Sequence, residues 1–169
     1  MKFQFYLEKL KESENFKKFK KENPSAILVG GFFTLDKTGS DKKVDEQHLD
    51  FYDSDKKELF SFCLNDSCQK THVEIIDEDY SPEKILDKLD FDFNKIEKII
   101  NKKIEEEKIK NKIQKILYSL QRKNKNDFLI GTIFLSGMGL IKFSFDLKEN
   151  KIIDFEKKSF FDILRVKKG

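Results

Sequence analysis

The residues best suited to binding a metal ion are confined to one short part of the chain. Both histidines and both cysteines of the 169-residue sequence lie between positions 48 and 72: His48, Cys63, Cys68 and His72. Two thiolates and two imidazoles are a ligand set that suits tetrahedral zinc. We expect His48, Cys63 and His72 to project from one side of a sheet, opposite Phe60 and Phe62. One hypothesis is therefore a small zinc-dependent protein or enzyme.

The same four residues also fit a purely structural interpretation. The spacing Cys-x4-Cys-x3-His belongs to no common zinc finger, and His48 would have to arrive from a different strand. In this interpretation Cys63 is half-buried and packs as a small apolar residue, Cys68 lies in a turn, and both histidines lie on the surface. The sequence favours this second interpretation, in which no cofactor is bound.

Arrangements of a nucleophile with a neighbouring base are missing from the sequence. Two histidines and no Gly-x-Ser-x-Gly elbow leave acyl transfer without a recognisable nucleophile and base. Gly137-Met138-Gly139 precedes a strand-like run, whereas a phosphate loop leads into a helix, so we interpret it as a hairpin turn. No catalytic residue is assigned, and a non-catalytic protein is favoured.

The charge of the chain gives little attraction to nucleic acid. Lys and Arg total 34 against 31 Asp and Glu, and only two of the basic residues are Arg. Arg supplies the planar fork that reads bases and clamps phosphate, whereas Lys is a hydrated point charge. Lys17-Lys18 and Lys20-Lys21 flank Phe16 and Phe19, but base stacking needs exposed rings and these are expected to face the core. A nucleic-acid accessory protein is therefore a less favoured alternative.

Export and membrane signals are not visible in the sequence. The longest apolar runs are about eight to ten residues, short of the ~20 that a membrane helix needs. Met1–Phe5 leads into a charged segment without the apolar centre of a signal peptide. Two cysteines do not make a disulfide framework. We expect a cytoplasmic protein with no membrane partner.

Two similar apolar segments dominate the predicted fold. Ile27–Phe33 (ILVGGFF) and Phe128–Phe134 (FLIGTIF) each follow a Lys-rich segment with helical periodicity and precede a hairpin-like run. Helices are expected over 2–22, 82–89, from Asn94 to a break near 105–108, over 108–122 and after Ser159. Strands are expected over 26–35, 47–53, 58–64, 71–76, 128–135, 140–147 and 151–157.

This element order predicts an α+β fold with antiparallel sheets packed against helices. The repetition suggests an internal duplication of an α-β-β-β unit with pseudo-twofold symmetry. Residues 1–80 would form a first α-β-β-β-β half, 81–107 connecting helices, and 108–169 a second α-β-β-β half with a C-terminal helix. Together these parts would make one compact unit.

The element order resembles tandem cystatin-like and PepSY-like units and, to a lesser degree, the SecB-type chaperone fold. The sequence also resembles small archaeal proteins of unknown function. The resemblance lies in Glu22-Asn23-Pro24 before Gly30–Phe33, in Ser136–Leu140 and in Ser159–Asp162. Neither resemblance implies an activity or assigns a functional residue, and a fold alone does not fix a function.

The sequence therefore favours a non-catalytic binding module. Such a module would recognise a protein or peptide partner, or a second copy of the chain, through a sheet edge or an exposed sheet face. The motivation is the absence of catalytic motifs together with aromatic residues in the predicted strands, Phe51, Tyr52, Phe143 and Phe145, which we expect to form an open patch.

Overall fold

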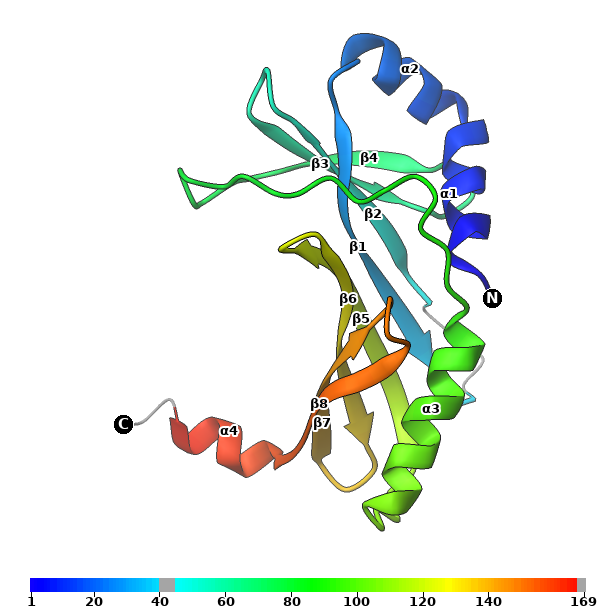
Figure 1. Ribbon diagram of the computed structural model, residues 1–169, viewed down its shortest axis with the longest axis vertical. Coiled ribbons are helices and arrows are strands. Elements are labelled where there is room, and N and C mark those ends of the chain that lie inside the picture. Colours follow the sequence, from blue (N-terminus) through cyan, green and yellow to red (C-terminus); the bar gives the residue numbers. More distant parts are fainter. Residues whose placement is uncertain (40–44, 167–169) are drawn as a thin grey trace.

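A single antiparallel sheet forms the body of the molecule. The computed structural model describes residues 1–39 and 45–166, and its eight strands follow the order β4-β3-β2-β1-β5-β6-β7-β8 (Figure 1). β1 and β5 meet antiparallel at the centre, and on either side each strand pairs with the next along the chain. The strands are β1 (Ile27–Asp36), β2 (Gln47–Asp53), β3 (Glu58–Cys63), β4 (Gln69–Val73), β5 (Ile113–Lys123), β6 (Asn126–Leu135), β7 (Gly139–Asp146) and β8 (Lys151–Ser159).

Three of the four helices in the described residues lie on one side of this sheet. Figure 1 shows α1 (Phe3–Glu12), α2 (Glu14–Glu22) and α3 (Phe93–Glu106) on the right, and α4 (Phe160–Val166) projecting on the left after β8. The helix expected over 2–22 is divided at Ser13. The extended backbone of Ser13 ends α1. The hydroxyl oxygen of Ser13 accepts a hydrogen bond from Phe16 N, and this bond caps α2.

The predicted duplication of an α-β-β-β unit with separate antiparallel sheets is wrong. All eight strands belong to one sheet, so the fold is mainly β with helices. The segment 108–122, expected to be a helix, contains most of β5. The two similar apolar segments also occupy different places, because β1 lies between β2 and β5 whereas β6 lies between β5 and β7.

The error at β5 has a physical cause. Ile113, Ile116, Leu117 and Leu120 recur at helical spacing, which favoured a helix. Ile116, Tyr118 and Leu120 are instead two positions apart in a strand, so they share one face, and all three side chains are buried. Leu117 points to the opposite face. Pairing with β1 on one side and β6 on the other outweighs a local helical pattern.

Aromatic rings fill the space between the sheet and α1–α3. Phe33 of β1 packs against Phe3, Tyr6 and Phe93, with ring centroids 6.2, 5.6 and 4.9 Å apart. In β6, Gly131 is the cross-strand partner of Phe143, and a Cβ at Gly131 would overlap that ring. This glycine therefore lets an aromatic side chain lie flat on the sheet.

The linker between β4 and α3 passes from one face of the sheet to the other. Tyr80 contacts Tyr52 edge to face, with centroids 5.5 Å apart, on the side away from α1–α3. Ile85 N then donates a hydrogen bond to Leu28 O, and Phe91 stacks on Phe3 in the core. The linker has no helix over 82–89, contrary to the prediction, and its Ile85 N–H is bonded to β1 instead.

Candidate functional site

The face of the sheet away from α1–α3, called here the open face, carries large exposed apolar side chains. Phe32 of β1 is 36% exposed, and Ile130 and Phe134 of β6 are 39% and 38% exposed. They alternate along their strands with buried residues of the covered face. Large apolar side chains therefore lie on both faces of the central strands, although only one face is packed against α1–α3.

These side chains form a contiguous group around Leu117 of β5. Phe32 and Ile130 both pair with the residue two positions after Leu117, and Phe134 pairs with the residue two positions before it. Leu117 is therefore the diagonal neighbour of all three, which is close enough for contact between large side chains. We call Phe32, Leu117, Ile130 and Phe134 the open strip.

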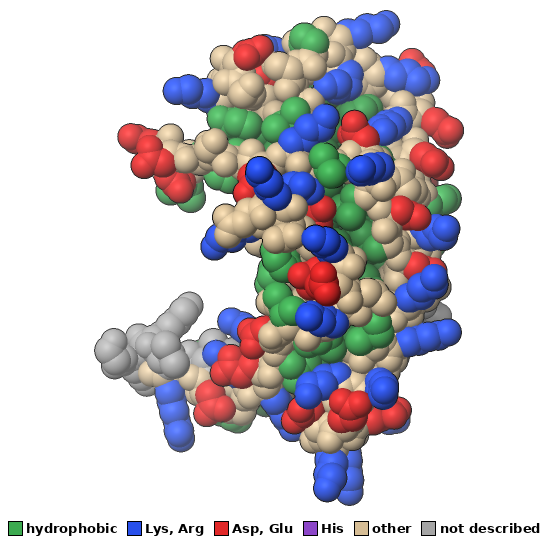
Figure 2. Space-filling view, in the orientation of Figure 1, with side chains coloured by type: hydrophobic (Ala, Val, Ile, Leu, Met, Phe, Trp, Pro, Cys, Tyr) green, Lys and Arg blue, Asp and Glu red, His purple; other side chains and the backbone are tan. Residues whose placement is uncertain are grey.

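The molecule is hollowed on the side where the open face lies. Figure 2 shows a recess between the upper lobe and the projecting α4, with hydrophobic side chains reaching the surface along its floor. In Figure 1 the linker and the β5–β6 turn lie above this recess, and α4 lies below it. The recess therefore leaves the middle of the sheet accessible from one direction.

A pocket of ≈370 Å³ adjoins the open strip at the β2–β1–β5 junction. It is lined by residues that include Gly30, Asp50, Tyr80, Ser119, Gln121 and Arg122. Gly30 is the cross-strand partner of Asp50, so β1 places no side chain beside the carboxylate. Burial raises the pKa of Asp50, and a hydrogen bond from Ser61 and the charge of His48 offset only part of this rise.

The positive charge of Arg122, on the wall of this pocket, is already neutralised by two carboxylates of the chain. Arg122 is 11% exposed, and its guanidinium lies 2.7 Å from Asp127 Oδ2 and 3.9 Å from Glu83. Glu83 also accepts hydrogen bonds from the backbone N–H groups of Asn124 and Lys125. Arg122 thus belongs to a network that fixes the linker to the β5–β6 turn.

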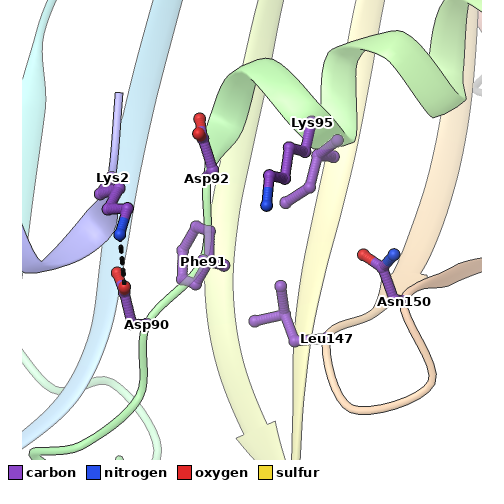
Figure 3. A pocket seen from close by; sticks show the side chains of 8 residues that line it. Lys2, Asp90, Phe91, Asp92, Lys95, Leu147 and Asn150 are labelled. Atoms are coloured by element: carbon purple, nitrogen blue, oxygen red, sulfur yellow. Dashed lines mark ion pairs between the residues drawn. The ribbon is translucent and has the colours of Figure 1, made fainter.

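A second pocket, of ≈310 Å³, lies beside the start of α3 (Figure 3). Its charged side chains bind one another. Lys2 Nζ lies 3.8 Å from Asp90, and the amino group of Met1 lies 3.1 Å from Asp92, which also caps α3 through Asn94 N. These contacts join the start of α1 to the linker, so this pocket is best explained as structural.

The four candidate metal ligands are not brought together. His48 and Cys63 are cross-strand partners on the open face, as expected. His72 is on the other face, because it pairs with Phe60 and contacts its ring, so the expectation of one common side is wrong for this residue. Cys68 is buried in a turn with positive φ. Across residues 1–39 and 45–166, no three His, Cys, Asp or Glu side chains are arranged to hold a metal ion.

The aromatic residues expected to form an open patch lie mostly in the core. Phe51, Phe143 and Phe145 are buried on the covered face, and only Tyr52 is half-exposed. Phe16 and Phe19, considered for base stacking, are buried as well. The apolar patch exists, but different residues form it. Its sequence signal was the apolar character of 26–35 on both faces, together with Leu117.

Comparisons with known proteins bear on the fold alone. No family model and no curated protein matches the sequence. Among solved structures, the crystal structure of a “putative lipoprotein” from Clostridium difficile 630 is similar, with a TM-score of 0.55 and 13% identity. The match covers 86% of this chain and 91% of that chain. Among the described residues, no helix is both long and apolar enough to cross a lipid bilayer.

Proposed function

We propose that the chain is a non-catalytic binding module whose open strip takes an extended peptide segment of a partner protein. The observation that carries the proposal is the grouping of Phe32, Ile130 and Phe134 around Leu117 on three adjacent central strands. Single exposed apolar residues are ordinary, but a contiguous group on the surface typically marks an interaction site.

The face is better suited to this role than the edges of the sheet. The edge strand β8 carries Lys151, Lys157 and Lys158, and Lys70 lies on the opposite edge strand, β4. Charged side chains on an edge discourage the addition of a further strand. The open strip, in contrast, has no charge among its four members.

The shape of the surroundings favours a peptide over a flat protein surface. The molecule is hollowed on the side of the open face (Figure 2), and a narrow segment can enter such a recess more easily than a broad protein surface can. The hydroxyl groups of Ser119 and Thr132 occupy neighbouring open-face positions, are partly exposed, and can hydrogen-bond the polar backbone of such a segment. Apolar side chains of the peptide would then pack on the strip.

A displayed library of random 12-residue peptides tests the proposal. Peptides selected on the wild-type protein should carry apolar residues at alternate positions, and their dissociation constants should rise at least about tenfold for Ile130→Lys, because a buried apolar contact is replaced by a charge. Ile76→Lys is the matched control, since Ile76 is 93% exposed in the linker. It should leave binding unchanged.

Two results would contradict the proposal. One is equal binding of the selected peptides to wild type and Ile130→Lys. The other is a wild-type dimer in sedimentation that Ile130→Lys converts to a monomer, because the strip would then be an interface between two copies of the chain.

A further inference from the structure

We infer that the pocket at Asp50 is a subsite for an organic cation, namely the ammonium group of a lysine side chain in the bound peptide. The inference deepens the proposed function, and rests on it only for the source of the cation. The pocket and the strip are contiguous, since Ser119 lines the pocket and pairs with both Phe32 and Ile130. A peptide on the strip can therefore place one side chain into the pocket.

The pocket offers a negative charge that no cation of the chain neutralises by contact. The ion pairs of the described residues include none to Asp50. His48, two residues away on the same strand, influences it only at a distance, and its own Nε2 lies 3.8 Å from Glu46. A desolvated carboxylate without an opposite charge gains most from a ligand that supplies one.

The walls of the pocket also suit an ammonium group. Tyr80 lines it and packs edge to face on Tyr52, and aromatic rings attract cations. Gln121 Nε2 donates to Ser119 Oγ at 3.1 Å, so the carbonyl oxygen of Gln121 is available to accept a hydrogen bond from the ligand. Gly30 leaves the space above the carboxylate open, because it has no side chain.

An anionic ligand fits the same pocket poorly. Its only guanidinium, that of Arg122, is occupied by Asp127 and Glu83. Asp50 also lines the pocket, so an anionic ligand would meet a carboxylate and an arginine that is already paired with two others. Burial and the charge of Asp50 also raise the pKa of Tyr80, so that its hydroxyl stays neutral.

Nuclear magnetic resonance titration of the ¹⁵N-labelled protein tests the subsite. Butylammonium chloride is the charged probe and pentanol is its neutral counterpart of similar size. We expect saturable shifts of the amide signals of Gly30, Tyr80 and Ser119 with butylammonium, and none with pentanol. In Asp50→Asn the dissociation constant for butylammonium should rise at least about tenfold, because one charge-assisted contact is lost.

Asp154→Asn is the matched control, because Asp154 is an exposed carboxylate on the same face, on edge strand β8. It should leave butylammonium binding unchanged. Wild-type binding should also weaken as the pH falls, since protonation removes the charge of Asp50. The raised pKa of Asp50 places that loss at higher pH than for an ordinary aspartate. Equal response to pentanol, or unchanged binding in Asp50→Asn, would overturn the subsite.

Two peptides that differ only in having lysine or norleucine at one position test whether the bound cation is a peptide side chain. Tighter binding of the lysine peptide to wild type, but not to Asp50→Asn, supports a peptide side chain as the ligand. Butylammonium binding without any lysine preference would overturn that source. Peptides that require Ile130 but bind Asp50→Asn equally well would overturn the subsite and leave the strip proposal standing.

Discussion

Phe32 and Phe33 are neighbours in β1, yet they lie on opposite faces of the sheet and have opposite surroundings. Phe33 is 1% exposed and contacts the rings of Phe3, Tyr6 and Phe93. Phe32 is 36% exposed and belongs to the open strip. The same side chain is thus core on one face and surface on the other. What separates the two roles is the presence of the helices, not the composition of the strand.

Two aspartates of β2 repeat this comparison with charged groups. On the covered face, burial raises the pKa of Asp53, but hydrogen bonds from Ser25 and from the backbone N–H groups of Lys56 and Asp55 outweigh it, and the pKa lies below its ordinary value. On the open face, burial prevails and the pKa of Asp50 is raised. The covered carboxylate is held by three hydrogen bonds to one of its oxygens, whereas the open one has no ion pair within the described residues.

The largest expected effect comes from truncating Phe33, with the neighbouring Phe32 as the comparison. Phe33→Ala should lower the free energy of unfolding by about 3–5 kcal/mol, because it leaves a cavity among aromatic rings. Phe32→Ala should lower it by less than about 1 kcal/mol, because no helix packs on that side chain. Urea denaturation of both variants measures the difference. Equal losses would mean that the two faces are equally packed.

An intermediate effect is expected for Gly131→Ala. The added Cβ would overlap the ring of Phe143, so the ring must move and we expect a loss of about 2–3 kcal/mol in unfolding free energy. Gly139→Ala in the same hairpin is the control, since its nearest contact would be an ordinary 3.5 Å to Leu135. Thermal denaturation that ranks the two variants alike would show that the Phe143 ring does not cover β6.

The smallest expected effect has the opposite sign. Tyr118 is buried between Phe93 and Phe143, and its hydroxyl has no hydrogen-bond partner in the described part of the chain. Tyr118→Phe removes an unsatisfied polar group, so the unfolding free energy should rise by about 1 kcal/mol. Tyr52→Phe, on the open face, should change it by less than about 0.5 kcal/mol. A destabilised Tyr118→Phe protein would show that the hydroxyl is satisfied.

Local signals predicted several individual elements, although the predicted arrangement of those elements was wrong. Alternation gave β2 its observed bounds, and the expected break near 105–108 coincides with the end of α3 at Glu106 and a left-handed residue at Lys108. Ser159 and Asp162 form the expected cap of the last helix. These features depend on residues close in sequence, which is why they are visible before any tertiary contact is known.

Most of the features that escaped prediction depend on distant pairing, and the division of the first helix at Ser13 is the local exception. The helical spacing in β5 could not be rejected without knowing that β1 and β6 flank it. Similarly, the pocket joins Asp50 of β2, Tyr80 of the linker and Ser119 of β5, which only the register of the sheet brings together. His72 was predicted on the wrong face, because the register of β4 against β3 decides which face of the sheet its side chain occupies.

Two isoleucines of β6 give the most direct test of an open, ligand-binding face. Ile130 is 39% exposed on the open face and Ile133 is fully buried on the covered face. Methyl resonances recorded with a soluble gadolinium chelate should show strong broadening of Ile130 and little of Ile133, and a selected peptide should protect Ile130 alone. Equal protection of both methyl groups before any peptide is added would contradict the account, because the open face would then already be covered.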